Sequence, residues 1–228
     1  MLNKLLATLR DGRLHIRALP WLVAFVFLET IFVWLTIFVM VDPQNSFDVS
    51  VTNFIHQFSN PVLDKIMIVI SLPGEFPISG LVLIFFGAWL YRRYQNKGLL
   101  LATTLTGFTL VSEAFKVWVS RPRPEIFLTE GYRLPSDFSF PSGHASFYIL
   151  VLGLALLIAL SEFKLRKERN RLVIAVLLAI LSVGISRVYL GVHWATDVLG
   201  GYLLGLGLLE VLVIVYYLTS ARKFWLLR

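Results

Sequence analysis

The sequence predicts an all-α fold, a bundle of six transmembrane helices in one membrane-embedded domain that covers residues 1–228. Three observations predict this fold. The chain is 57% hydrophobic with a mean hydropathy of +0.75, which is too apolar for an ordinary soluble domain. It contains six apolar segments of about 20 residues, the length that crosses a bilayer core of ~30 Å as a helix. No repeat or shift in composition divides it.

The apolar segments define the expected helices in order. They are Trp21–Val41, Pro61–Tyr91, Leu99–Val119, Ala145–Leu160, Leu172–Leu190 and Trp194–Leu218. We expect the first to be an uncleaved anchor, because no small-residue cleavage site follows it. The second is interrupted by Ser71-Leu72-Pro73-Gly74, so it should form two helical pieces that meet at a kink. The stretch Ser46–Ser59 is amphipathic and is expected to lie along the membrane interface.

The distribution of the 21 Lys and Arg residues predicts the orientation. Most occupy short connections that would share one side of the membrane, and cytoplasmic connections carry such an excess. Those residues are Lys4, Arg10, Arg13, Arg17, Arg92, Arg93, Lys97, Lys164, Arg166, Lys167, Arg169, Arg171, Arg222, Lys223 and Arg228. Both termini are therefore expected in the cytoplasm, with the protein in the plasma membrane. The clusters lie between apolar runs and not along one polar face, so no nucleic-acid partner is expected.

Composition also restricts the chemistry. The chain has no cysteine, which excludes disulfides, thiolate catalysis and cysteine-ligated metal centres and leaves the redox compartment open. Any reaction must use His, Ser, Asp, Glu, Lys or Arg.

Polar residues gather where four predicted helices end on the outer side. The third span ends in Lys116-Val-Trp-Val-Ser-Arg-Pro-Arg123-Pro124, the fourth follows Pro141-Ser142-Gly143-His144, the fifth ends at Ser186-Arg187, and the sixth opens with His193-Trp-Ala-Thr-Asp197. Backbone N–H groups at a helix N-terminus favour a phosphate, and Arg and Lys bind phosphate oxygens. His193 and Asp197, four residues apart on one expected helical face, can meet, and the carboxylate would fix the imidazole tautomer. These residues predict a site that processes an anion.

These strings resemble the three-part signature of the type 2 phosphatidic acid phosphatase superfamily of membrane lipid phosphatases. The matching strings are Lys116-x6-Arg123-Pro124, Pro141-Ser142-Gly143-His144 and Ser186-Arg187-x5-His193-x3-Asp197. The resemblance implies that Lys116, Arg123 and Arg187 hold the phosphoryl oxygens, together with Ser142 and the Gly143 amide. It implies that His193 is the nucleophile, that Asp197 orients it, and that His144 protonates the leaving oxygen.

The resemblance further implies a substrate class and the absence of a cofactor. The expected substrate is a lipid phosphate or diphosphate at the outer leaflet: undecaprenyl pyrophosphate, phosphatidylglycerol phosphate or phosphatidic acid. No metal and no cofactor are expected. The motifs concern only the phosphate, so the lipid tail, like the oligomeric state, stays open.

Other interpretations fit the same residues. Each motif alone also fits a structural role, as a helix cap, a snorkelling cation or a structural His–Asp pair. A transporter or lipid-binding protein could keep the pocket without hydrolysis, and vanadium haloperoxidases share the constellation. Glu29, Glu113 and Glu210 lie within spans, where Glu113 is expected to neutralise Lys116 one turn later and the other two have no assigned role. Arg121 and Arg133 are interpreted as surface charges.

Overall fold

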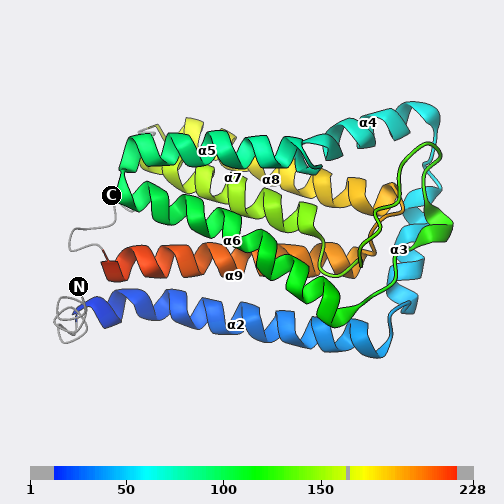
Figure 1. Cartoon of the computed structure of the whole chain (residues 1–228), viewed down its shortest axis with the longest axis horizontal. Coiled ribbons are helices and arrows are strands. Elements are labelled where there is room, and N and C mark those ends of the chain that lie inside the picture. Colours follow the sequence, from blue (N-terminus) through cyan, green and yellow to red (C-terminus); the bar gives the residue numbers. More distant parts are fainter. Residues whose placement is uncertain (1–12, 163–164, 220–228) are drawn as a thin grey trace.

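The computed structural model describes residues 13–162 and 165–219, and within these ranges every regular element is helical (Figure 1). The all-α prediction is confirmed. In chain order the elements are α2 (Arg13–Val41), α3 (Ser46–His56), α4 (Pro61–Ser71), η1 (Leu72–Gly74), α5 (Ile78–Tyr94), α6 (Asn96–Val119), η2 (Glu125–Phe127), α7 (Gly143–Glu162), α8 (Arg166–Tyr189) and α9 (Ala195–Thr219).

Within the described residues, four helices are long and apolar enough to cross a membrane, which makes the chain a multi-pass membrane protein. The crossing segments are Leu19–Val41, Gly143–Leu160, Arg166–Tyr189 and Ala195–Val213. The α4–η1 and α5 pieces, bent by 45°, would make a fifth span if they act as one. Helix α6 occupies the place of the predicted third span, and its crossing stays a prediction, so the count of six is not established.

The break between α4 and α5 has a local cause in the sequence. Asn60 caps α4 by accepting hydrogen bonds from the backbone N–H groups of Val62 and Leu63, and Pro61 occupies the first turn. The helix gives way to the single 3₁₀ turn η1, which contains Pro73, and α5 starts directly after Pro77. Proline supplies no backbone N–H, so a helix cannot continue regularly through these positions. The predicted kink is confirmed.

The helices pack around a core shared by α2, α7 and α9. Helix α9 contacts both α2 and α7, α8 packs against α7 and α4, and α5 pairs with α6. Phe32 of α2 stacks on Phe140, with ring centroids 6.0 Å apart, and Leu150 and Leu204 lie in the same buried cluster. Many large apolar side chains stay exposed on the outer surface, as a surface that faces lipid tails requires.

The two ends of the bundle differ. Helix α2 begins and α9 ends at one end, on the left in Figure 1, where α5 also ends and α6 and α8 begin. The opposite end holds α3, the connection 120–142 and the turn from α8 to α9. Several predicted cytoplasmic cations lie outside the described residues, as do both chain termini. They are Lys4, Arg10, Lys164, Arg222, Lys223 and Arg228.

Candidate active site

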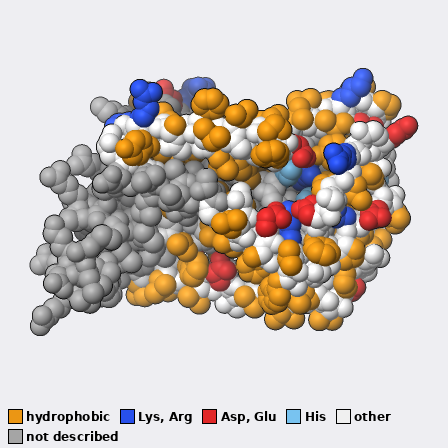
Figure 2. All heavy atoms as spheres, viewed as in Figure 1, with side chains coloured by type: hydrophobic (Ala, Val, Ile, Leu, Met, Phe, Trp, Pro, Cys, Tyr) orange, Lys and Arg blue, Asp and Glu red, His pale blue; other side chains and the backbone are white. Residues whose placement is uncertain are grey.

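A cavity of about 310 Å³ lies among α5, α6, α7 and the connection 120–142. Six of the eight predicted site residues line it: Lys116, Arg123, Gly143, His144, Arg187 and His193. Figure 2 shows charged and histidine side chains gathered around a hollow in this part of the molecule, with hydrophobic side chains on much of the remaining described surface in that view. The four polar helix ends that the sequence identified therefore meet at one place.

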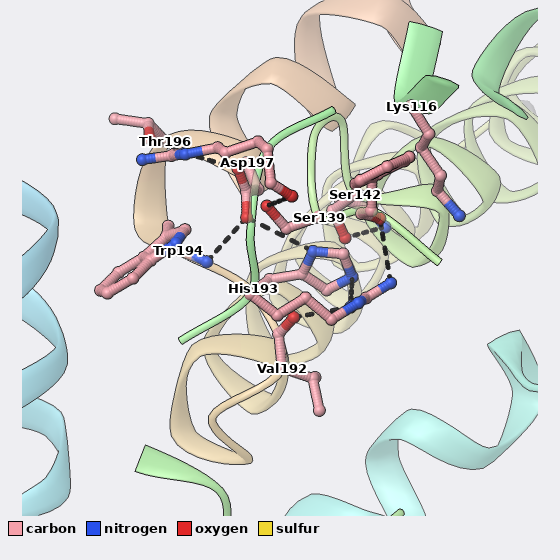
Figure 3. A network of polar contacts seen from close by, with 12 residues as sticks. Lys116, Ser139, Ser142, Val192, His193, Trp194, Thr196 and Asp197 are labelled. Atoms are coloured by element: carbon pink, nitrogen blue, oxygen red, sulfur yellow. Dashed lines mark hydrogen bonds and ion pairs between the residues drawn. The ribbon is translucent and has the colours of Figure 1, made fainter. Parts of the chain in front are cut away.

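His193 lies in the short turn that joins α8 to α9. Its Nδ1 is 3.5 Å from Asp197 Oδ2 (Figure 3). Its Nε2 is 3.3 Å from Nη1 of Arg123. Burial, together with the positive charges of Arg123, Arg187 and Lys116, holds the pKa of His193 well below its ordinary value of 6.5. The imidazole is therefore neutral at neutral pH, with one nitrogen toward the carboxylate and the other toward the pocket.

The expected placement of His193 on a helical face is wrong. Helix α9 begins at Ala195, so His193 precedes it. Asp197 in the first turn accepts a 2.8 Å hydrogen bond from the backbone N–H of Trp194. A carboxylate in this position satisfies a donor that the helix start leaves open. The cap therefore closes the turn and brings Asp197 beside the imidazole.

The interpretation of Arg121 as a surface charge is also wrong. Its side chain is fully buried, with Nη1 2.5 Å from Asp197 Oδ1 and Nη2 2.7 Å from Asp48 Oδ2. Asp48, on α3, also accepts hydrogen bonds from the backbone N–H and the hydroxyl of Thr196. Buried charges are stable only when paired and hydrogen-bonded. The network ties α3 and the connection 120–142 to the start of α9, behind His193.

Lys116 and Arg123 approach the pocket from the end of α6 and the connection that follows. Both contact Asp137: Lys116 through its ammonium group, and Arg123 through Nη2 at 2.7 Å from Oδ1. Burial raises the pKa of Asp137, but the hydrogen bond from Lys116 and the charges of both cations outweigh it, so that the pKa lies below its usual value. Glu113 bonds Lys116 at 2.8 Å, which confirms the expected neutralisation.

Arg187, at the end of α8, meets residues that the α4–α5 break delivers. Its Nη1 donates to the Ser71 hydroxyl and to Glu75 Oε1, the latter at 3.0 Å, and to the Tyr132 hydroxyl at 2.7 Å. The Tyr132 hydroxyl donates in turn to Glu75. The kink is therefore part of the site, which sequence reasoning did not predict.

The N-terminus of α7 supplies the remaining predicted residues. His144 Nε2 lies 3.3 Å from Glu75 Oε1, and Gly74 lies so close that a methyl group there would come within 2.3 Å of His144 Cδ2. Gly143 leaves the space toward Lys116 open, since a side chain there would point at the ammonium group, 3.9 Å away. Ser142 is fully buried, does not line the cavity, and donates its backbone N–H to the Asp197 carbonyl at 3.0 Å, which fixes its backbone against the start of α9.

Sequence reasoning missed several residues at the site. They are Asp48, Ser71, Glu75, Ser112, Tyr132 and Asp137. One signal was available, because Ser112 lies one helical turn before Lys116 and shares its face. Asp48, Glu75 and Tyr132 come from separate segments whose meeting depends on the tertiary fold.

Comparison with known proteins identifies a family. Residues 96–223 match the model of the PAP2 superfamily. The chain is 37% identical over 150 residues to phosphatidylglycerophosphatase B of Bacillus subtilis. The matched region covers 64% of this chain and 71% of that protein. It is 31% identical over 166 residues to undecaprenyl-diphosphatase of Sulfolobus acidocaldarius, and this match covers 70% of this chain and 73% of that protein.

The fold has a solved counterpart as well. The crystal structure of a transmembrane PAP2 type phosphatidylglycerolphosphate phosphatase from Bacillus subtilis matches with a TM-score of 0.69 and 29% identity. The match covers 88% of this chain and 98% of that one.

Proposed function

Because the chain belongs to the PAP2 superfamily and is a lipid phosphatase, we propose that it removes the terminal phosphate of a membrane lipid phosphate or diphosphate through a phosphohistidine on His193. The observation that carries this proposal is the meeting of the three motifs at one pocket. The two histidines there would act as nucleophile and as acid–base group, and the three cations would stabilise the charge of the transferring phosphoryl group.

In the first step Nε2 of His193 attacks phosphorus with its lone pair. The bond from phosphorus to the lipid oxygen breaks, and that oxygen keeps the bonding electrons and takes a proton from His144. Asp197, beside Nδ1, would hold the N–H on that nitrogen and stabilise the positive charge that develops on the ring.

The positive charge that stabilises the transferring group would come from side chains. Lys116, Arg123 and Arg187 line the pocket with His193, and such preorganised donors are the main source of catalysis in phosphoryl transfer. The Gly143 amide and the Ser142 hydroxyl would add hydrogen bonds. The mechanism includes no metal ion.

In the second step a water molecule attacks the phosphohistidine. Neutral His144 takes a proton from that water, the bond from phosphorus to Nε2 breaks, and its electrons return to His193. Inorganic phosphate leaves, and His144 again carries the proton it needs for the next cycle.

For the substrate we propose the lipids that the relatives' names indicate, a phosphatidylglycerol phosphate or undecaprenyl diphosphate, with phosphatidic acid as a third candidate. Leu83, Phe108 and Phe147 form an apolar wall beside the polar groups. An apolar wall discriminates weakly between hydrocarbon chains, so we expect broad tolerance of the tail.

We propose one domain over residues 1–228, in which α6 also crosses the membrane and brings the number of spans to six. Both termini would lie in the cytoplasm, and the pocket would open to the outer face of the plasma membrane. The described ends of α2 and α9 lie at the bundle end opposite α3. A reporter enzyme fused after Arg228 tests the orientation, since an extracytoplasmic reporter would place the pocket in the cytoplasm.

The central experiment measures phosphate release by the purified protein in detergent with a chelator, across the three candidate lipids. His193→Ala should lose about 10³-fold or more of the activity while keeping the unfolding temperature. Activity equal to wild type in this variant would refute the mechanism. Tight binding of the lipid phosphates without release would favour a transporter or binding protein, and halide oxidation by vanadate-loaded protein would favour a haloperoxidase.

A further inference from the structure

Two carboxylates already form ion pairs with the three cations of the pocket. Asp137 bonds both Lys116 and Arg123, and Glu75 bonds Arg187 at 3.0 Å and lies 3.3 Å from His144 Nε2. All three cations proposed to hold phosphoryl oxygens therefore have a carboxylate partner. The carboxylate oxygens stand where a phosphate would have to bind.

The two carboxylates are held more loosely than the cations. The side chains of Asp137 and Glu75 are each 36% exposed, and both lie on irregular segments, in the connection 120–142 and in the α4–α5 break. Arg187, by contrast, is 1% exposed. Either carboxylate can therefore turn outward without opening the core, whereas the cations stay fixed.

The carboxylates also leave donors of the pocket unsatisfied. Among the described residues, neither Nε of Arg187 nor the Ser112 hydroxyl has a hydrogen-bond partner, although both atoms are buried. An unpaired buried donor is costly. A tetrahedral phosphate group offers more acceptor oxygens, in more directions, than the two carboxylates supply.

A ligand must therefore compete with two anions that are already in place. An intramolecular group acts at high effective concentration, and the attraction of a cation for its partner grows with the charge of that partner. A phosphodiester has one negative charge, so its attraction to the cations is little stronger than that of a carboxylate. A terminal phosphate with two negative charges is attracted more strongly.

We propose that Asp137 and Glu75 are specificity-determining counter-anions, which yield to a doubly charged terminal phosphate and exclude the singly charged phosphodiesters that form the bulk of a membrane. This inference rests on the proposed function, since it assigns the phosphate to the same pocket. It explains how a site with three cations can work in a bilayer without being blocked by ordinary phospholipid head groups.

The test compares inhibition in wild type, Asp137→Asn, Glu75→Gln and the double variant. Hydrolysis of a soluble aryl phosphate in detergent reports activity, and dioleoyl phosphatidylglycerol and inorganic phosphate serve as the inhibitors. We expect the inhibition constant of the phosphodiester to fall about tenfold or more in the double variant and less in each single variant. Selectivity for inorganic phosphate over the diester should decrease. Glu125→Gln, which removes an exposed carboxylate outside the pocket, should change neither constant.

Unchanged or weaker binding of the diester in the folded double variant would overturn the proposal, because the carboxylates would then only hold the cations in position. The same comparison in a His193→Ala background, read as the ligand-induced shift of the unfolding temperature, needs no turnover. It therefore separates the two ideas: a missing phosphate release in wild type refutes the proposed function, whereas an unchanged diester shift refutes the counter-anions. If the double variant does not fold, the single variants give the same comparison.

Discussion

The guanidinium of Arg121 lies 2.5 Å from the carboxylate of Asp197, and both side chains are completely buried. Asp197 uses Oδ1 for this ion pair and Oδ2 for the contact with His193. The charge of Asp197 is thus stabilised from the side opposite the imidazole. Asp48 completes the arrangement at 2.7 Å from the same guanidinium, so the position of His193, the proposed nucleophile, depends on α3, far away in the sequence.

Replacing Arg121 should destabilise the end of the bundle that holds α3. Arg121→Met leaves two buried carboxylates without their cation, and removing one partner of a buried pair costs about 3–5 kcal/mol. We expect a clear fall in unfolding temperature in detergent, with loss of activity as a consequence. Arg133→Met removes an exposed arginine of the same connection and should leave stability nearly unchanged. Equal stability of the two variants would show that the network carries little energy.

Arg121 illustrates which features of the structure could be predicted from the sequence and which could not. Hydropathy predicted the helices, since a span must be continuous and apolar, and motif spacing predicted the residues that meet at the pocket. Burial of Arg121 could not be predicted from the chain, because its partner Asp48 belongs to a stretch that looked like an interfacial helix. The sequence also does not show that the α4–α5 kink turns Glu75 toward Arg187. Both features depend on contacts between distant segments.

The neutral state of His193 predicts a specific pH dependence of activity. Burial and the neighbouring cations hold its pKa well below 6.5, so His193, the proposed nucleophile, stays unprotonated through the range in which an ordinary histidine titrates. We expect the acid limb of kcat/KM, corrected for the ionisation of the substrate, to lie below pH 6.5. A limb at or above that value would show that His193 takes up a proton too readily for this role.

Stability should depend on the same group, with a definite sign. In the unfolded chain His193 binds a proton below about pH 6.5, whereas in the folded state it does not, so acid favours unfolding. The free energy of unfolding should fall by up to about 1.4 kcal/mol per pH unit below that value. His193→Asn removes this contribution, and the difference between wild type and variant isolates it. Parallel curves for the two proteins would contradict the assigned ionisation.

Gly74→Ala tests the contact between the α4–α5 break and His144. A methyl group at Gly74 would lie 2.3 Å from His144 Cδ2, so the imidazole must move away from its present position. A displacement of about 1 Å at a reacting group can cost roughly 10²-fold in rate. We expect kcat/KM for lipid phosphates to fall by that order, with a smaller effect on the unfolding temperature. Gly107→Ala on α6, where nothing lies within 4 Å, is the matched control and should retain activity.

Gly191→Ala addresses the turn that presents His193. Gly191 has φ of +69°, a backbone conformation that residues other than glycine rarely adopt. A methyl group there would lie 2.0 Å from the carbonyl oxygen of Phe127. The strain of the left-handed conformation alone costs about 1–2 kcal/mol, and the contact with backbone cannot be relieved by rotating a side chain. Activity and unfolding temperature should therefore fall together, unlike in Gly74→Ala. Wild-type stability in Gly191→Ala would mean that the turn can adopt a second conformation without displacing the connection 120–142.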